Sequence, residues 1–419
     1  MGERKESTLV VDLARQQQFH ARAISLDQNP VIAIHKPGST AIDLRRLLLQ
    51  KQDETAVNKL INPEGKWIYR VDRTIDPADT SPRDLFKGFM NDLEPVYNAV
   101  SFSLDSLRPY GFNRHDRAHV ERVGETGFYL LEQGGYDENT QRLFAAAAAS
   151  HDLGNLLSRF SQSVLATQIF RDIYPNLKFE QKDWRKIERA VKRHEENIAR
   201  GLHDSYLKHA TPTTLAKRST DMLNHFRPEG LALIASDKMH VGRERVSVKA
   251  NDPRAVDSDP HTATNLLLET TSTTVQGDKF SWNLDFNPEV RASELPRFGG
   301  LALPHSSRDG YKIYVSQHAH DLYRNEGKPH FKSAVEQFFD IYQERVELTV
   351  ESIFALLPNV QTFEMGFADR SATNGFTFDT AAKITRYERE GFSDKFLAYL
   401  SNPQDDPHFH KPRKPLRRA

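Results

Sequence analysis

Two histidines four residues apart, His115 and His119, form the first group in the chain with recognisable chemistry. An α-helix has 3.6 residues per turn, so side chains four positions apart lie on the same face. A His151-Asp152 doublet follows, and Asp237 later supplies a lone carboxylate within an apolar segment. Imidazole nitrogens and carboxylate oxygens, delivered from separate segments to one point, form a ligand set suited to a divalent transition metal.

The segments that must position these groups have the hydrophobic periodicity of helices. From Ser81 onward, apolar residues recur at steps of three and four, and Ser81 followed by Pro82 is a good N-cap and first-turn pair. Asn113 is the predicted N-cap of the next helix, which carries both histidines and ends at Gly134. Residues 139–150 form another helix, and its run of small side chains permits a close approach of the neighbouring helices.

Two later amphipathic helices place polar groups on apolar faces. His194 lies on the apolar stripe of the helix predicted over residues 183–200. Asp237 shares a face with Leu233 in the helix predicted over residues 229–241. A buried carboxylate is unfavourable unless another group pairs with it or it coordinates a metal. The position of Asp237 on an apolar face is therefore stronger evidence for a metal site than that of His194.

The flanking segments have a different character. In the N-terminal segment, the sequence predicts strands over residues 30–35 and 66–71 and a helix over residues 42–50. After residue 250, apolar runs on both sides of Gln276-Gly277-Asp278 predict a β-hairpin, and residues 332–357 return to helical periodicity.

These patterns predict a mainly α protein whose chain has four parts. The parts are an N-terminal α/β extension (1–80), a metal-binding helical domain (81–250), a C-terminal extension with a β-hairpin and long helices packed on the core (251–405) and a basic, disordered tail (406–419).

Composition narrows the class of protein. The 419 residues carry 57 lysines and arginines against 57 aspartates and glutamates, so the whole chain has no electrostatic bias toward nucleic acid or a membrane surface. Cysteine is absent, which excludes disulfides, thiolate catalysis and cysteine-bound zinc. With no apolar run long enough to span a bilayer, we expect a soluble, cytoplasmic protein, with homo-oligomerisation left open.

The ordered set His119, His151-Asp152 and Asp237 resembles the H…HD…D signature of the HD-domain superfamily of metal-dependent phosphohydrolases. The resemblance spans roughly residues 81–246 and implies an HD-type helical-bundle core. It also implies that these four residues bind one divalent metal, and that Asp152 bridges to a second ion in binuclear members. His194 is the best candidate for an additional ligand.

The resemblance extends to further residues. His209 and His225 are weaker candidate ligands, in a segment interrupted by prolines. His115 and His119 are similar to the His-x-x-x-His of cyclic-nucleotide phosphodiesterases in this superfamily, where the earlier histidine acts as a general acid. This chain has Asp116 where those enzymes carry asparagine, so the subfamily stays open.

The expected reaction is hydrolysis of a phosphoester, with a nucleotide or another small phosphorylated molecule as the substrate. A bound divalent ion (Mn²⁺, Mg²⁺, Fe²⁺, Co²⁺ or Ni²⁺, one or two per chain) would activate the attacking water. We assign catalytic roles to His115, Asp152 and Lys238. Substrate phosphate contacts are predicted for four nearby arginines: Arg114, Arg117, Arg193 and Arg243.

Two alternatives from other classes stay open. Some HD-domain proteins hold a di-iron centre that activates O₂, a chemistry that needs at least two additional histidine ligands. The other alternative is a metal-stabilised helical module without catalytic activity, which binds a nucleotide or a partner protein.

Overall fold

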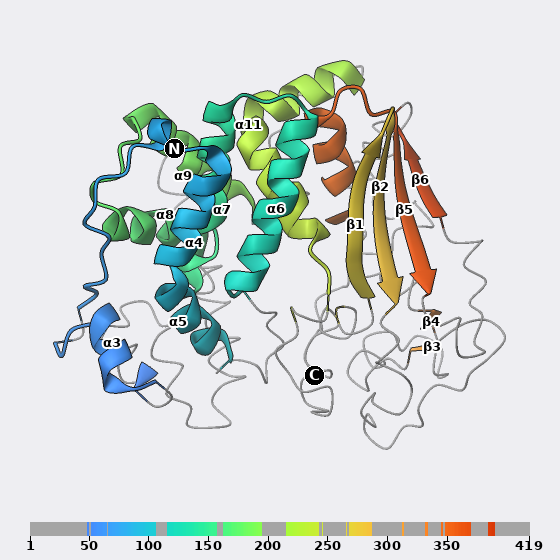
Figure 1. Ribbon diagram of the computed structural model, residues 1–419. Helices are drawn as coiled ribbons and strands as arrows, with labels where there is room; N and C mark the ends of the chain where they lie inside the picture. Colours follow the sequence, from blue (N-terminus) through green and yellow to red (C-terminus); the bar gives the residue numbers. More distant parts are fainter. Residues whose placement is uncertain are drawn as a thin grey trace, which may run out of the picture.

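A computed structural model shows a helical body with a β-sheet beside it (Figure 1). The described residues are 48–49, 52–64, 66–105, 115–156, 162–194, 215–242, 245, 265, 268–286, 312–313, 332–333, 345–346, 348–369 and 384–389. One hydrophobic core runs through the described parts, from Leu48 in the N-terminal segment to Met365 in the sheet. The prediction of a mainly helical fold is confirmed.

The body opens with α4 (Pro82–Asp92), α5 (Glu94–Asp105) and α6 (Arg117–Gln133). Ser81 caps α4 as predicted, with its side chain accepting a hydrogen bond from the amide of Asp84. The apolar periodicity after Ser81 runs across two helices, because Pro95 has no amide hydrogen to continue the ladder of α4 and instead stands in the first turn of α5. The N-cap of α6 is Asp116. The predicted cap, Asn113, lies outside the described residues.

Helix α7 (Glu138–Ser150) lies at the centre of the body and contacts α4, α6, α8 (Gln162–Ile173), α9 (Gln181–His194) and α11 (Leu215–Met239). Its alanine run, Ala145 to Ala149, is fully buried. Side chains of one carbon let the neighbouring helices approach closely, so several helices can deliver side chains to the C-terminal end of α7.

Helix α11 changes direction at Arg227, whose φ of 64° is not helical and precedes Pro228. Proline disfavours the helical conformation of the residue before it, which accounts for the break. The piece after the break corresponds to the helix predicted from residue 229, and it carries Asp237.

The sheet has the strand order β1-β2-β5-β6. Its strands are β1 (Leu268–Gln276), β2 (Lys279–Phe286), β5 (Thr362–Asp369) and β6 (Ile384–Glu388). The predicted β1–β2 hairpin is present, turning at Gly277 with a φ of 62°, and β2 pairs with β5 in parallel. Two short strands, β3 (Lys312–Ile313) and β4 (Lys332–Ser333), form a separate pair.

The sheet is joined to the helical body along β1 and through a helical segment, residues 348–356 (Figure 1). The amide of Val275 in β1 donates to the hydroxyl of Tyr129 in α6 at 2.7 Å. The Tyr136 hydroxyl, just beyond α6, donates to the carbonyl of Leu356 at 3.2 Å, and Arg389 donates to the carbonyl of Phe354 at 2.7 Å. The helical segment therefore contacts both the body and the end of β6.

Two local predictions were wrong. Residues 66–71 do not form a strand, and Trp67 makes only an isolated bridge to Ile61. The amide of Val71 instead donates to the carbonyl of Ile173, so this segment packs on the helices. Residues 332–333, predicted as the start of a long helix, are strand β4. The predicted strand at 30–35 and the basic tail lie outside the described residues.

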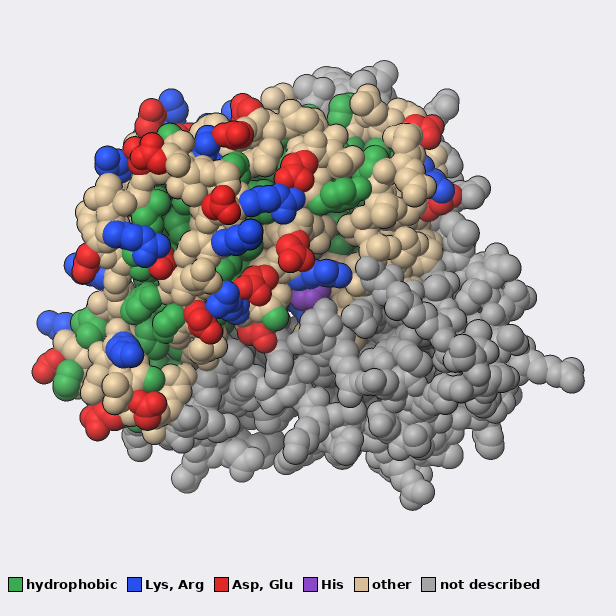
Figure 2. Space-filling model, in the orientation of Figure 1, with side chains coloured by type: hydrophobic (Ala, Val, Ile, Leu, Met, Phe, Trp, Pro, Cys, Tyr) green, Lys and Arg blue, Asp and Glu red, His purple; other side chains and the backbone are tan. Residues whose placement is uncertain are grey.

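The described surface mixes both charges. Figure 2 shows lysine and arginine side chains interspersed with aspartate and glutamate over the described part of this face. None of the described helices has the length and apolar character that crossing a bilayer requires.

Close packing of α6 on α7 depends on Gly127. A Cβ atom there would overlap the ring of Phe144, which is fully buried, so the ring or the helices would have to shift. We expect Gly127→Ala to lower the free energy of unfolding by about 1–3 kcal/mol, the usual cost of overpacking a core. Gly88→Ala in α4 is the matched control, because nothing lies within 4 Å of its added Cβ.

The control substitution should raise the free energy of unfolding by about 0.4–1 kcal/mol, since alanine restricts the unfolded chain more than glycine does. Urea denaturation followed by circular dichroism measures both values. Equal stabilisation by the two alanines would contradict this account of the α6–α7 contact.

Candidate metal centre

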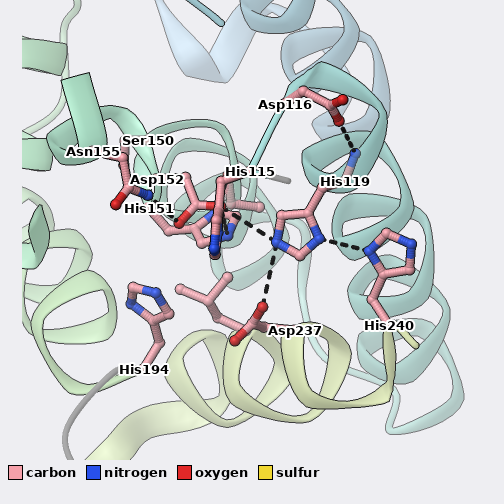
Figure 3. Close-up of polar contacts among 12 residues, drawn as sticks. His115, Asp116, His119, Ser150, His151, Asp152, Asn155, His194, Asp237 and His240 are labelled. Atoms are coloured by element: carbon pink, nitrogen blue, oxygen red, sulfur yellow. Dashed lines mark hydrogen bonds and ion pairs between the residues drawn. The ribbon is translucent and has the colours of Figure 1, made fainter. Parts of the chain in front are cut away.

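The four residues predicted as metal ligands converge from three helices (Figure 3). His119 lies in the first turn of α6, His151 and Asp152 follow the last residue of α7, and Asp237 lies near the end of α11. All four are buried, and the most exposed of them, Asp237, retains only 8% of its accessible surface. Residues separated by more than a hundred positions in the sequence thus form one polar cluster inside an apolar core.

Distances between the ligand atoms are those of groups that surround one ion. His119 Nε2 lies 3.3 Å from Asp152 Oδ2 and 3.3 Å from Asp237 Oδ1. His151 Nε2 lies 3.2 Å from Asp152 Oδ2. Two ligands, each about 2.1 Å from a metal and roughly 90–110° apart, are separated by about 3.0–3.4 Å.

The histidine nitrogens that face this point lack well-aligned hydrogen bonds. Nε2 of His119 and Nε2 of His151 are buried and lie 3.2–3.3 Å from carboxylate oxygens, but neither makes a hydrogen bond of good geometry. A buried polar atom that is left unsatisfied costs about 1–3 kcal/mol, so these contacts alone satisfy the two nitrogens poorly. A divalent cation would satisfy both nitrogens, so the residues present fit a metal ion.

Hydrogen bonds on the far side of the imidazole rings prepare them for coordination. His151 Nδ1 donates to the carbonyl of Ala148 at 2.8 Å, and His194 Nδ1 donates to the carbonyl of Val191. A proton fixed on Nδ1 leaves the lone pair on Nε2, which is the arrangement typical of metal-binding histidines.

The local chain path explains how Asp152 is presented. The amide of Asn155 donates to the carbonyl of Asp152 at 3.0 Å, and this bond turns the chain into the 3₁₀ helix η4 (Leu153–Leu156). The Asn155 side chain also donates to Asp152 Oδ1 at 3.1 Å. One carboxylate oxygen is thereby oriented by Asn155, while Oδ2 points toward the histidines.

Both carboxylates are ionised at neutral pH. Burial alone would raise the pKa of Asp152, but His115 and His151 beside it hold this pKa well below its ordinary value. Burial would also raise the pKa of Asp237, and Lys238 is the main group that holds it well below normal. Two buried anions at one point favour occupation by a cation.

The histidines differ in their protonation. Burial lowers the pKa of His194 to about 3, with the nearby His151 ring acting in the same direction, so His194 is neutral at physiological pH. Burial alone would lower the pKa of His151 as well, but the Asp152 and Asp237 carboxylates outweigh it and raise this pKa. A cation must therefore compete with a proton at His151, and metal binding releases protons.

The cluster extends beyond the four residues to two further predicted histidines, His194 and His115. His194, at the end of α9, has its ring 5.0 Å from that of His151, and its ligand nitrogen lies within 4.8 Å of ligand atoms of His151 and Asp152. His115 is buried, with Nδ1 2.9 Å from Asp152 Oδ2. Five predicted metal ligands (His119, His151, Asp152, His194 and Asp237) and the proposed general acid His115 thus lie together, although their individual roles stay predictions.

The basic residues predicted to take part in catalysis or substrate binding have different partners in the structure. Lys238 Nζ donates to Asp237 Oδ2 at 2.5 Å, so this cation lies at the edge of the cluster. Arg117 instead donates to Glu121 at 2.6 Å and to Asn91 at 3.1 Å, on the surface of α6.

Arg193 and His225 lie outside the cluster. Arg193 donates to the carbonyl of His225 and lies over the Phe226 ring, and His225 belongs to none of the metal-ligating groups found among the described residues. Three predicted positions lie outside the described residues: Arg114, His209 and Arg243.

One buried histidine, His240, was missed by the sequence analysis. Its Nδ1 lies 2.6 Å from His119 Nδ1, and the two rings are stacked with centroids 4.8 Å apart. The sequence feature that could have identified His240 is its spacing of three residues from Asp237, which places both side chains at the same end of α11.

No protein-family model, curated protein or solved structure matches the chain. The metal centre is therefore supported by the buried histidine and aspartate cluster itself.

Proposed function

We propose that this protein is a divalent-metal-dependent phosphohydrolase of the HD-domain type, which cleaves a phosphoester of a nucleotide or similar small molecule. The observation that carries the proposal is the pair of unsatisfied Nε2 atoms, on His119 and His151, that face two ionised carboxylates in a buried site. The order of the ligands along the chain supports the superfamily, as does their delivery from a helical bundle.

Each residue of the cluster has its own proposed role in such a reaction. His119, His151, Asp152 and Asp237 would hold the ion, with His194 available beside them. A bound divalent ion supplies an activated water and screens the charge of the phosphoryl oxygens. Lys238, whose Nζ lies 2.5 Å from Asp237 Oδ2, would add a second positive charge beside the ion to attract phosphoryl oxygens.

His115 is the proposed proton donor to the leaving oxygen. Its Nδ1 lies 2.9 Å from Asp152 Oδ2, so a metal ligand orients the imidazole ring. This contact holds the ring against a proposed metal ligand, as a proton donor to a substrate on the ion would require.

Substitution of His115 tests the chemistry separately from metal binding. We expect His115→Gln to retain the metal and to lower kcat about 10²–10⁴-fold for a phosphoester with an alkyl leaving group, the usual contribution of a general acid. The loss should be much smaller for the 4-nitrophenyl ester, because nitrophenolate leaves without a proton.

The assay is phosphate or nitrophenol release with Mn²⁺, Mg²⁺, Co²⁺, Ni²⁺ and Fe²⁺ in turn, beside metal analysis of each sample. His225→Gln is the matched control, since this half-buried histidine lies outside the cluster. Equal losses for both leaving groups would contradict the role of His115. No hydrolysis by wild-type protein across a panel of nucleotides and other phosphoesters would contradict the proposed function.

A di-iron oxygenase is the second candidate, and one observation favours it. His115 and His194 join the four signature residues, so the cluster contains six potential ligands. Two irons per chain and consumption of O₂ would establish this function, whereas one ion per chain together with phosphate release would exclude it.

A further inference from the structure

A histidine outside the signature lies against the proposed metal ligand His119. His240 directly follows α11 and is buried, with 4% of its surface accessible. The 2.6 Å separation joins Nδ1 of one ring to Nδ1 of the other, and the planes are only 11° from parallel. Figure 3 shows His240 on the side of the His119 ring opposite Asp152 and Asp237.

A hydrogen bond between two Nδ1 atoms requires one proton between them. His119 Nε2 faces the carboxylates and must keep its lone pair to bind a metal. A His119 ring that binds a metal through Nε2 therefore carries its proton on Nδ1, where it is donated to His240, and His240 carries its own proton on Nε2. The reverse arrangement would place a proton on His119 Nε2 and block coordination.

We propose that His240 is a positioning residue, which accepts the Nδ1 proton of His119 and thereby keeps His119 in the tautomer that binds the metal. This inference rests on the proposed metal centre. Metal-binding histidines commonly donate their other ring N–H to a carboxylate or a carbonyl oxygen. His151 and His194 follow that rule with the carbonyls of Ala148 and Val191, whereas His119 uses a second imidazole.

The chain around His240 fixes the position of the accepting ring. The carbonyl of His240 accepts a hydrogen bond from the buried Arg245 guanidinium at 3.1 Å. On either side, Thr270 of β1 donates its hydroxyl to the carbonyl of Met239 at 2.6 Å and its amide to the carbonyl of Val241 at 2.7 Å. The first strand of the sheet thus anchors the end of α11, which gives the C-terminal extension a part in preparing the metal centre.

The test compares His240→Phe, which removes the acceptor and keeps a flat ring, with His240→Gln, whose amide oxygen accepts a hydrogen bond. Titration calorimetry with Co²⁺ should show that His240→Phe weakens metal binding about 10–100-fold, the usual effect of losing such a partner. His240→Gln should restore most of the affinity, and His225→Phe should leave it unchanged. If His240→Phe does not fold, His240→Leu replaces it.

A second readout needs no bound metal. Long-range ¹H–¹⁵N spectra of the metal-free protein should report the His119 proton on Nδ1 in wild type and in His240→Gln, and a mixture of tautomers in His240→Phe. Unchanged affinity in His240→Phe, or an equal loss in His240→Gln, would overturn the role of His240 alone. Wild-type protein that binds no Co²⁺ would instead overturn the metal centre and the proposed function with it.

Discussion

Removal of the divalent ion is expected to lower the midpoint of thermal unfolding by roughly 5–10 °C. An ion present at about a thousand times its Kd stabilises the folded state by about 4 kcal/mol, and about 1 kcal/mol corresponds to roughly 2 °C in a large domain. The ion would link α6, α7 and α11 through His119, Asp152 and Asp237, so its loss releases ligands on three helices at once.

Differential scanning calorimetry before and after dialysis against a chelator measures this shift. Addition of Mn²⁺ should restore the original midpoint in wild-type protein and have no effect on Asp152→Asn. A midpoint that does not respond to chelator or to added metal would show that no ion contributes to the folded state.

Replacement of Asp152 by asparagine is expected to abolish metal-dependent phosphate release, with a loss of about 10³-fold or more. The carboxylate lies within 3.3 Å of ligand atoms from His115, His119 and His151, and the neutral amide supplies no charge to bind or orient the ion. Metal-based charge stabilisation contributes several kcal/mol to the barrier, and each 1.36 kcal/mol is worth about tenfold in rate.

Asp183→Asn is the matched control for this substitution. Asp183 is also a buried carboxylate on a helix, but it pairs with Lys186 at 3.0 Å and belongs to none of the metal-ligating groups among the described residues. Its loss should change stability slightly and leave turnover per folded molecule intact. Retained activity in Asp152→Asn, or equal losses in both variants, would contradict the role of Asp152.

The main elements of the site could be predicted from the sequence because they depend on local patterns. Periodicity predicted the helices, and polar groups on apolar stripes, such as His194 and Asp237, stood out because burial is unfavourable for them. The Ser81 cap and the turn at Gly277 follow equally local rules.

Other features depend on distances that the sequence does not contain. His240 meets His119 across 121 positions, a contact that only the packing of α6 against α11 creates. Arg117 is adjacent to the ligands in sequence but turns to Glu121, since helical periodicity directs it to another face. Residues 66–71 are rich in the aromatic and β-branched residues that favour strands, yet the amide of Val71 donates to the carbonyl of Ile173 at the end of α8.

The central claim is that the buried cluster binds a divalent metal, and elemental analysis of purified protein tests it most directly. Wild type and Asp183→Asn, each reconstituted with Mn²⁺ and freed of excess, should contain one or two ions per chain, and Asp152→Asn should contain almost none. An absence of metal from wild-type protein, or equal metal in wild type and Asp152→Asn, would contradict it.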